Sequence, residues 1–377
     1  MKFHDTARDA AGSDLAPEAA GPGRFTRRSL LVGALSGAGL VLTGGVAQAG
    51  SRQVPGRGQG HGNGHGHRRP RVLVATNEPW GTYHVQPLLH EARRQGWDVV
   101  QLVPDLSGVT PGDPVTVATL DDAPDADLLV VTGAGDWPAD CAKRLRHLPL
   151  VASSLAYQLP VEAPRAAEFR RRLRAITASS PAEAAVFDDY LGTGRRDIAV
   201  VGTPQTDALP RHAPEPGTVL VLTSVTKSDE TGGSAPGTEL LLAAAERLAA
   251  EGRHILVGLH PREDRSLWDR YEISSVPSVQ ASARAEVAVG IPGTVFPVVA
   301  AVGVPLVGCT DPRLQIPGYL LSVCSRTISS ADEVLPAVAD AEPVPGKVLY
   351  EAVGPVGGSA RRLLRVWQKE MRHASRR

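Results

Sequence analysis

Residues 71–103, RVLVATNEPWGTYHVQPLLHEARRQGWDVVQLV, decide the fold class of this chain. The segment opens with the short apolar run 71–76 and closes with a second one at 97–103. Between them, residues 85–95 have the spacing of an amphipathic helix, and Gly96 ends it. A strand, a loop, a helix and a strand in this order are typical of a parallel sheet with right-handed crossovers.

The same alternation continues toward the C-terminus. Further strands are predicted at 127–132, 149–153, 175–179 and 198–202, and helices at 164–174 and 181–190. Prolines then cluster from Pro204 to Pro216 and are followed by Gly217, which is typical of a linker. A second unit repeats the pattern, with strands predicted at 218–223, 255–259, 286–290 and 305–308, and helices at 238–251 and 294–302.

These two units predict an α/β protein built of two Rossmann-like, doubly wound domains that face a cleft. We place the first domain at 70–210 and the second at 211–345. The last segment, 346–377, contains an amphipathic helix at 359–373. One side of this helix is apolar and consists of Leu363, Leu364 and Trp367. We therefore expect the helix to pack back toward the first domain.

The N-terminal segment 1–49 has the features of a twin-arginine export signal. The pair Arg27-Arg28 precedes an apolar, glycine-rich run from Leu30 to Val46 that contains no charged residue. The run ends at Ala47-Gln48-Ala49, the small-x-small pattern that signal peptidase accepts. We expect the Tat translocase to be a partner during export, and the mature protein to be extracytoplasmic and without a membrane span. A retained N-terminal anchor helix is the alternative.

Residues 50–69 are rich in Gly, Arg and His and include His61, His65 and His67. Such a composition cannot bury enough apolar surface to offset its ordering entropy, so we expect a disordered linker. Neutral imidazoles can bind Zn, Ni or Cu, and metal sequestration is one alternative function. No Cys or carboxylate completes a site there, so we predict no metal site and no cofactor.

The charge balance argues against nucleic acid as a partner. Lys plus Arg number 40 and Asp plus Glu also number 40, so the chain has no basic excess to neutralise phosphates. Three cysteines without CxxC spacing allow at most one disulfide, for instance Cys309 with Cys324. Each cysteine lies in or beside an apolar stretch, so a buried thiol is the simpler interpretation.

The first candidate site follows the first predicted strand, in NEPWGTYH at 77–84. Gly81 and Thr82 permit a close backbone approach, and the start of the next helix favours an anionic group. Glu78 and His84 are titratable and lie where a doubly wound sheet binds its ligand, so either is a candidate general base. A capped loop with a packed aromatic side chain is the structural alternative.

The second candidate site lies in the second unit. His260 directly follows a predicted strand, and Arg262 can hold a phosphate in a fork geometry. The segment GIPGT at 290–294 ends a strand and begins a helix, so the amides after Gly293 and the Thr294 hydroxyl form a candidate phosphate cradle. These groups together suit a nucleotide diphosphate. A structural histidine and plain helix initiation remain the alternatives.

Four stretches of the chain resemble the two-domain GT-B glycosyltransferases, including CMP-sugar and CDP-polyol transferases and the related nucleotide-sugar epimerases. They are GTYHVQPLL at 81–89, VVGTPQTDAL at 200–209, LHPRED at 259–264 and IPGTVFPVVAAVGVPLVG at 291–308. The resemblance implies that His260 and Thr294 bind phosphate or ribose and that 81–84 faces the acceptor. The helix after 294 lacks the carboxylate that many members use for the ribose, and no DxD motif follows a strand. A metal-independent, inverting transfer is therefore implied.

Export restricts the function, because activated nucleotide sugars are cytoplasmic. We expect a glycosyltransferase-like protein that acts on or binds a cell-envelope glycan, or a nucleotide- or phosphate-bearing ligand, in the interdomain cleft. A lipid-linked donor would suit an enzyme outside the cytoplasm. The alternative is a non-catalytic, two-lobed binding protein for a small molecule or glycan.

Overall fold

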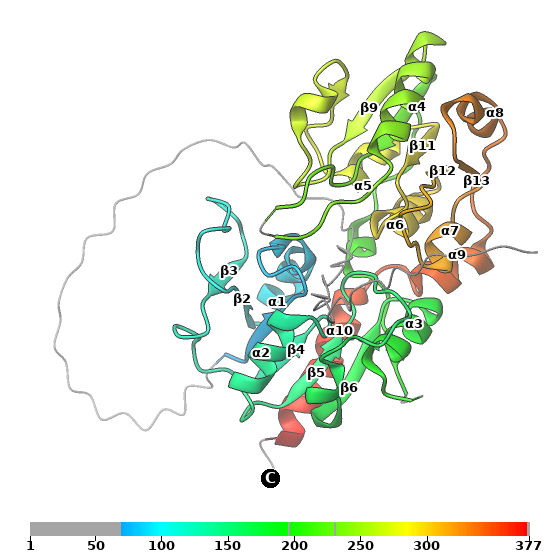
Figure 1. The fold of residues 1–377 in the computed structure, drawn as a ribbon. Coiled ribbons are helices and arrows are strands. Elements are labelled where there is room, and N and C mark those ends of the chain that lie inside the picture. The colour runs from blue at the N-terminus through cyan, green and yellow to red at the C-terminus, as the bar shows by residue number, and fades with distance from the viewer. Residues whose placement is uncertain (1–68, 195–196, 230, 375–377) are drawn as a thin grey trace, which may run out of the picture. The chain divides into compact units, whose positions relative to one another are not determined.

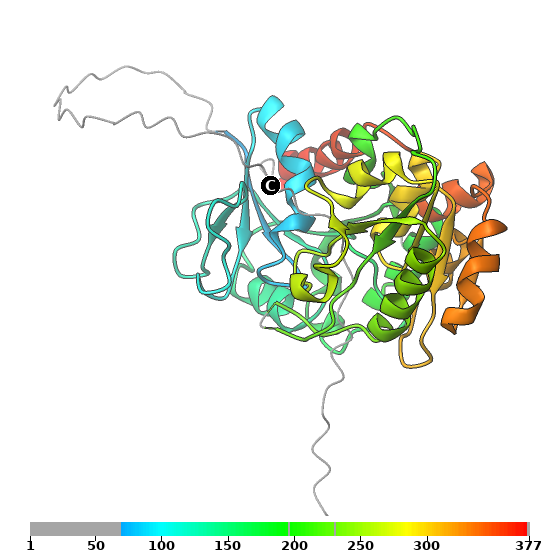
Figure 2. The ribbon, with the colours of Figure 1, turned by 90° about the horizontal axis from the view of Figure 1, so that it is seen from above.

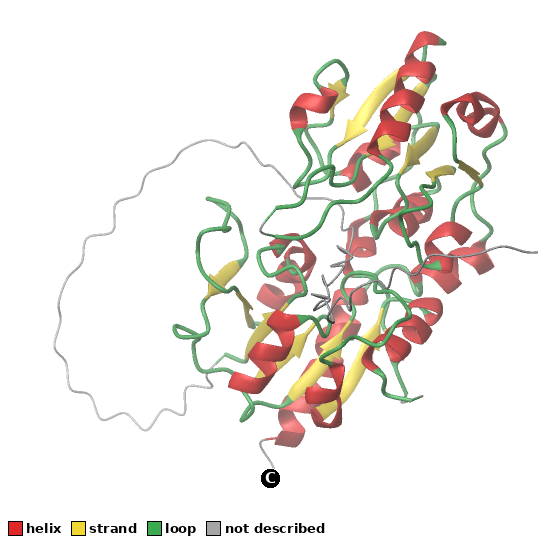
Figure 3. Ribbon diagram, viewed as in Figure 1, coloured by secondary structure: helices red, strands yellow, loops and turns green. Residues whose placement is uncertain are grey.

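The computed structural model describes residues 69–194, 197–229 and 231–374. The predicted export signal at 1–49 and almost all of the predicted linker at 50–69 lie outside these residues. Within the described ranges the chain forms two parallel sheets with helices packed on them, as Figures 1 and 3 show. The predicted α/β class with two doubly wound sheets is confirmed.

The first sheet is formed by the N-terminal half of the described chain. Its strands are β1 (Arg71–Ala75), β2 (Asp98–Leu102), β3 (Thr116–Ala118), β4 (Leu128–Val131), β5 (Leu150–Ser153), β6 (Leu173–Ala178) and β7 (Ala199–Val200). They are parallel in the order β3-β2-β1-β4-β5-β6-β7. The order reverses between β1 and β4, which is the topological switch point where such sheets bind ligands.

Alternation along β1 shows why this sheet needs helices on both faces. Val72 and Val74 face α1 (Leu89–Arg94) and α10 (Ser359–Ala374), whereas Leu73 and Ala75 face the cluster that contains α2 (Asp136–Arg144) and α3 (Pro181–Leu191). Successive side chains of a strand point to opposite faces, so an all-apolar strand is buried on both sides. All four side chains are at most 1% exposed.

The second sheet repeats this plan. Its strands are β8 (Thr218–Leu222), β9 (His254–Gly258), β10 (Glu272–Ile273), β11 (Val287–Gly290), β12 (Leu306–Cys309) and β13 (Arg326–Ile328). They are parallel in the order β10-β9-β8-β11-β12-β13, with the switch point between β8 and β11. The helices of this half are α4 (Thr238–Ala250), α5 (Ser278–Ala281), α6 (Val295–Val302), α7 (Gly318–Ser322), α8 (Val334–Ala339) and α9 (Gly346–Val353).

The C-terminal helix α10 packs on the first sheet, although the second sheet precedes it in the chain. Its apolar side buries Leu363, Leu364 and Trp367 in the same cluster as β1, and the Trp367 Nε1–H donates a 3.0 Å hydrogen bond to Ser153 Oγ. Asp207 caps its first turn by accepting from the backbone amides of Ser359 and Ala360. Figures 1 and 2 both show the red helix beside the blue elements of the first sheet.

Two predicted helices differ from the structure. The helix predicted at 164–174 is wrong: two short 3-10 turns occupy Ala166–Glu168 and Arg170–Arg172, and β6 begins at Leu173. Leu173 pairs with Leu150 of β5, so the chain is already a strand where the predicted helix would have its last turn. The helix predicted at 85–95 starts later, at Leu89, after a 3-10 turn that contains Pro87, which has no N–H to donate.

The remaining expectations concern cysteines and membranes. Cys141, Cys309 and Cys324 are all free, so the candidate disulfide between Cys309 and Cys324 is absent. Among the helices of the described ranges, none combines the length and apolar character that a bilayer span requires.

Candidate functional site at the carboxyl ends of the strands

Glu78 lies just beyond the carboxyl end of β1, in a tight turn that brings three buried polar side chains together. The turn closes through a 2.8 Å hydrogen bond from the Gly81 amide to the Glu78 carbonyl, and a 3-10 turn follows at Thr82–His84. A Cβ on Gly81 would lie 3.1 Å from both Glu78 and His84. Glycine at this position therefore lets the two titratable side chains approach each other.

The side chains of Glu78, Tyr83 and His84 form one cluster. The Tyr83 hydroxyl donates a hydrogen bond to Glu78 Oε2, and His84 Nε2 lies 3.6 Å from the same oxygen. All three residues are at most 8% exposed. Burial acts to raise the pKa of Glu78, but the hydrogen bond and charge of His84, the Tyr83 hydroxyl and the charge of Arg262 together hold it below 4.5. Glu78 is thus a buried carboxylate that stays ionised.

The same environment raises the pKa of Tyr83, whereas it lowers that of Glu78. Burial, together with the charge of Glu78 and the hydrogen bond to it, raises the pKa of the Tyr83 hydroxyl well above 10. The phenol therefore remains protonated and serves as a fixed donor to the carboxylate.

His260 comes from the other sheet and meets this cluster. Its backbone amide donates to Thr223 Oγ1 at 2.7 Å, which ties the ends of β8 and β9 together. The Arg262 amide donates to His260 Nδ1 at 3.1 Å, so Nε2 is the ring nitrogen that carries hydrogen. The imidazole packs edge-to-face on Tyr83, with ring centroids 5.9 Å apart. Glu78 and His84, predicted from one motif, and His260, predicted from another, therefore belong to one polar centre.

Arg262 makes its hydrogen bonds to the loop that follows β8. Its guanidinium binds within its own domain, where Nη1 lies 3.2 Å from Asp229 Oδ1 and Nη2 donates to the Gly233 carbonyl at 2.9 Å. A Cβ on Gly232 would lie only 2.4 Å from Nη1, so the glycine-rich loop closes directly on the guanidinium. Arg262 holds the loop between β8 and α4, and its charge still acts on Glu78.

Thr82 also has a partner in its own domain. Its hydroxyl donates to Asp113 Oδ2, and the other carboxylate oxygen of Asp113 accepts from the Val115 amide at 2.8 Å. Nearby, the Trp80 indole N–H donates to the Asp105 carbonyl at 2.9 Å. Thr82 and Trp80 therefore anchor the segment between β2 and β3 beside the cluster.

Asn77 fixes the turn from the other side. Its Nδ2 donates to Gln158 at 3.1 Å and to the Tyr190 hydroxyl at 3.0 Å, and its Oδ1 accepts from the Gly135 amide at 3.0 Å. A Cβ on Gly133 would lie 2.2 Å from the Asn77 amide, which no side chain tolerates. This network couples the ends of β1 and β4 at the switch point.

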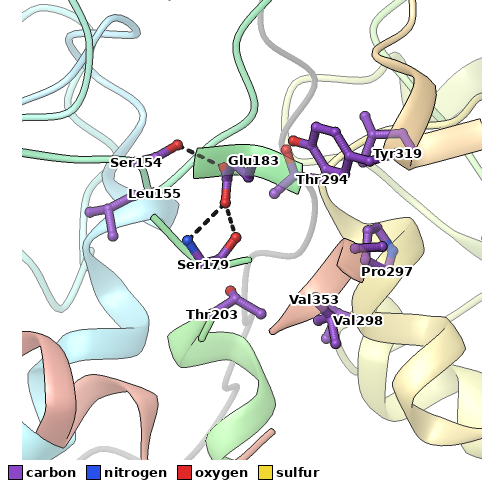
Figure 4. Close-up of a pocket in the computed structure, with 12 residues that line it drawn as sticks. Ser154, Leu155, Ser179, Glu183, Thr203, Thr294, Pro297, Val298, Tyr319 and Val353 are labelled. Atoms are coloured by element: carbon purple, nitrogen blue, oxygen red, sulfur yellow. Dashed lines mark hydrogen bonds between the residues drawn. The ribbon is translucent and has the colours of Figure 1, made fainter. Parts of the chain in front are cut away.

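Thr294 lies in a second place, a small cavity of about 20 Å³ between the two halves (Figure 4). Glu183 on α3 is the titratable group there and accepts from the Ser154 hydroxyl at 2.7 Å and from the Ser179 amide at 2.9 Å. Burial raises the pKa of Glu183 to about 7, against the opposing effect of these hydrogen bonds. Tyr319 completes the polar part of the lining.

Gly293 is buried directly before α6, and its carbonyl accepts from the Phe296 amide at 3.0 Å. Of the seven predicted site residues, Glu78, His84 and His260 therefore lie in one cluster with the charge of Arg262 beside it, Thr82 lies at its margin, and Thr294 lies in the Glu183 cavity. In the residues that the structure describes, no three His, Cys, Asp or Glu side chains are placed to hold a metal ion.

Two residues were missed from the sequence. Tyr83 sits between two predicted site residues, Thr82 and His84, but was not itself predicted as a site residue. Glu183 had a local signal: Ser180, Pro181 and Glu183 open a helix directly after a strand, and the Ser180 hydroxyl accepts from the Glu183 amide. That pattern predicts a helix start, but it does not reveal that the carboxyl group is enclosed.

Comparison with known proteins places the fold. No protein-family model matches the sequence, and no curated protein does. Among solved structures, the wall teichoic acid polymerase TagF matches with a TM-score of 0.55 at 9% identity, covering 82% of this chain and 90% of that one. The structure of S. aureus MnaA with UDP matches with a TM-score of 0.51 at 12% identity, covering 81% of this chain and 97% of that one.

The UDP-GlcNAc 2-epimerase of Methanocaldococcus jannaschii gives a TM-score of 0.50 at 12% identity, covering 80% of this chain and 99% of that one. Identities this low show the fold alone. The chain therefore has the two-domain, GT-B-like α/β fold that such glycosyltransferases and nucleotide-sugar epimerases share.

Proposed function

We propose that this protein is an exported, glycosyltransferase-like enzyme that acts on a cell-envelope glycan and takes a phosphate-bearing donor between its two sheets. The observation that carries the proposal is the ionised Glu78, buried with Tyr83 and His84, with the His260 imidazole from the second half packed on Tyr83. A buried carboxylate is costly unless it is compensated, and clusters of this kind are characteristic of functional sites.

Glycosyl transfer needs a base for the hydroxyl of the acceptor and a donor of hydrogen bonds for the departing phosphate. Within the described residues, Glu78 Oε1 has no hydrogen-bond partner, whereas Oε2 accepts from Tyr83. In the proposed reaction Oε1 takes the acceptor proton, the acceptor oxygen forms the new bond to the anomeric carbon, and the bond to the phosphate oxygen breaks. In this reaction we assign to His260 Nε2–H the donation of a hydrogen bond to the leaving phosphate.

The nature of the donor follows from the proposed location. The similar structures include a wall teichoic acid polymerase and a protein bound to UDP, which supports a phosphate-linked sugar or polyol as the donor class. Nucleotide-activated sugars are not supplied outside the cytoplasm, so a lipid-linked phosphosugar fits an exported enzyme best. Oε1 is enclosed in this arrangement, so entry of substrate requires the surrounding loops to part.

The binding-protein alternative has one observation in its favour. The Arg262 guanidinium, the strongest candidate phosphate ligand, is bound to Asp229 and Gly233 of its own domain. A protein that only closes on its ligand needs rigid loops but no base.

Replacement of Glu78 by Gln separates the two functions. The chain from Gly50 is incubated with nucleotides, nucleotide sugars and polyprenyl-phosphate sugars, and both the shift of the unfolding midpoint and the transfer of sugar are measured. We expect Glu78→Gln to keep the ligand-induced shift and to lower transfer by about 10²- to 10⁴-fold. The exposed Glu251→Gln is the matched control. If ligands raise the unfolding midpoint of the wild type but no sugar is transferred, the binding-protein alternative is favoured.

Export has its own test. Cells that carry Arg27→Lys together with Arg28→Lys should retain the precursor inside, because the adjacent arginines are what the twin-arginine pathway reads. Fractionation and immunoblotting measure this directly. Unchanged export of the double variant would contradict the proposal.

A further inference from the structure

A second hollow is larger than the Glu183 cavity and is lined by elements of both halves of the protein. It is a groove of about 670 Å³ lined by the turn before α1, α1 itself, the hinge turn Pro204–Ala208, α5 and the start of α10. In Figure 1, α1 belongs to the lower sheet and α5 to the upper one. A ligand in this groove therefore contacts both halves of the protein and the hinge at once.

Three separate elements each contribute a glutamine and a proline to this groove. The pairs are Gln86 with Pro87 before α1, Gln205 with Pro204 in the hinge, and Gln280 with Pro277 at α5. Within the described residues, the three carboxamides make no hydrogen bond, and the buried Gln205 Oε1 lacks a partner altogether. A carboxamide both donates and accepts, which suits vicinal hydroxyl groups, and the apolar proline rings offer van der Waals contact to the C–H groups of sugars.

The charged side chains of the groove bear on whether its ligand carries an acidic group. Its two carboxylates are already engaged: Glu91 accepts from Arg94 at 2.5 and 2.7 Å, and Asp207 accepts from the first amides of α10 at 2.6 and 2.9 Å. Arg361 is exposed at the rim and makes no hydrogen bond within the described part of the chain. The formal charges of the lining balance, two carboxylates against Arg94 and Arg361, but the hydrogen-bond donors of the Arg361 guanidinium are not engaged and can meet an anionic substituent.

We propose that this groove binds a segment of a glycan chain that carries an acidic substituent. Its hydroxyls bond to Gln86, Gln205 and Gln280, and its anionic group meets Arg361. The inference deepens the proposed function and rests on it for the role of the chain as substrate. Gln86 follows His84 by two residues, so the groove and the Glu78 cluster are adjacent in the sequence, although none of the cluster residues lines the groove.

The test measures binding of three defined oligomers to the chain from Gly50 by titration calorimetry. The probes are a hyaluronan hexasaccharide, which carries carboxylates, a glycerol-phosphate hexamer, which carries phosphodiesters, and the neutral maltohexaose. We expect at least one acidic probe to bind, and a difference between the two identifies the acidic group. Each of Gln86→Ala, Gln205→Ala and Gln280→Ala should weaken binding about fivefold, because each removes one hydrogen-bonding group.

Arg361→Ala should lower the affinity for the acidic probe about threefold, as expected for the loss of an exposed ion pair. The affinity of this variant should also depend less on the salt concentration than that of the wild type. The matched controls are Gln315→Ala and Arg372→Ala, which are exposed residues outside the groove and should change nothing. The inference is overturned if no probe binds, if maltohexaose binds as tightly as both acidic probes, or if the glutamine variants bind like the wild type.

The two proposals fail in different ways. If Glu78→Gln abolishes transfer while the glutamine variants bind normally, only the groove inference is wrong. If the glutamine variants lose binding while Glu78→Gln keeps its full transfer rate, only the assignment of the base is wrong. Binding in the groove should survive Glu78→Gln, because Glu78 does not line it.

Discussion

Glu78 and Glu183 lie at the carboxyl edge of the same sheet, and their carboxyl groups behave in opposite ways. Glu78 follows β1 and Glu183 stands in the first turn of α3, after β6. Both residues are 4% exposed, so burial penalises their charge alike. Yet the pKa of Glu78 is lowered, whereas that of Glu183 is raised to about 7. Depth in the protein therefore does not decide the charge state.

The difference comes from the neighbours. Glu78 has the charges of His84 and Arg262 close to it, and these offset its desolvation. Glu183 is surrounded by neutral donors, the hydroxyls of Ser154 and Ser179 and the amide of Ser179 (Figure 4). Neutral hydrogen bonds stabilise a carboxylate less than a cation does, so burial prevails at Glu183.

The hydrogen-bond pattern at Ser154 agrees with a protonated Glu183. Ser154 Oγ lies 2.9 Å from the Ala156 carbonyl and 2.7 Å from Glu183 Oε1, but it has a single hydrogen to donate. If that hydrogen goes to Ala156, the proton on Glu183 supplies the second bond. One edge of the sheet thus holds one carboxyl group whose pKa is lowered and one whose pKa is raised, because their environments act in opposite directions.

The largest expected effect comes from His84→Ala, which would make Glu78 resemble Glu183. In the wild type the lowered pKa of Glu78 contributes stability that is present above pH 4.5 and is lost as the pH falls through the folded pKa. His84→Ala removes a hydrogen-bonding partner of the buried carboxylate together with most of a buried side chain, and we expect a loss of roughly 3–5 kcal/mol at pH 8. Because ionisation is then penalised, the loss should shrink at pH 4. Urea unfolding at both values measures it.

A double-mutant cycle isolates this effect from the cavity that His84→Ala creates. In a Glu78→Gln background no carboxylate remains to be ionised, so His84→Ala should cost much less at pH 8. An equal cost of His84→Ala at pH 4 and pH 8 would show that the histidine serves packing alone.

The second effect in size concerns Glu183→Gln. Because the folded pKa of about 7 lies above the ordinary 4.5, the native state binds more protons, and stability is lost as the pH rises from 4.5 through 7. Gln imitates the protonated carboxyl group and does not titrate. We therefore expect the variant to be about 3 kcal/mol more stable than the wild type at pH 8 and similar to it at pH 4. Urea unfolding across this range measures the difference.

The exposed Glu251→Gln serves as the control and should show no such trend. A constant difference between Glu183→Gln and the wild type from pH 4 to pH 8 would mean that Glu183 is ionised throughout. The comparison between the two glutamates would then be lost.

The sheets could be predicted from the sequence because their central strands are continuous apolar runs, such as β8 at Thr218–Leu222. The edge strands β3, β10 and β13 were missed, since they have only 2 or 3 residues and no apolar run. The same limit applies to helices: the short α5 and α7 have 4 and 5 residues, too few for a periodic pattern.

The position of the candidate site could be predicted from the sequence, but the hydrogen-bond and ion-pair partners of its side chains could not. Glu78, His84 and His260 follow strands directly, so topology alone brings them to one edge. Arg262 was expected at a phosphate, but the path of the loop from Thr223 to Gly237 decides where its guanidinium binds, and no local pattern encodes that path. Likewise, the charge state of Glu183 depends on its burial, and Tyr319, which lines the same cavity, comes from a distant segment of the chain.

The smallest effects come from removing one hydroxyl at each glutamate, by Tyr83→Phe and by Ser154→Ala. The Tyr83 hydroxyl donates to a carboxylate that is ionised at all pH values above 4.5, so its loss should cost about 2 kcal/mol and be constant from pH 5 to pH 9. Ser154 faces a group that is neutral below about pH 7 and charged above it. Its loss should cost about 1 kcal/mol at pH 5 and more at pH 9, because hydrogen bonds to charged groups are stronger.

Paired unfolding curves at pH 5, 7 and 9 distinguish the two profiles. Parallel profiles would mean that both glutamates carry the same charge, and the assignment of opposite pKa shifts along this edge would be wrong.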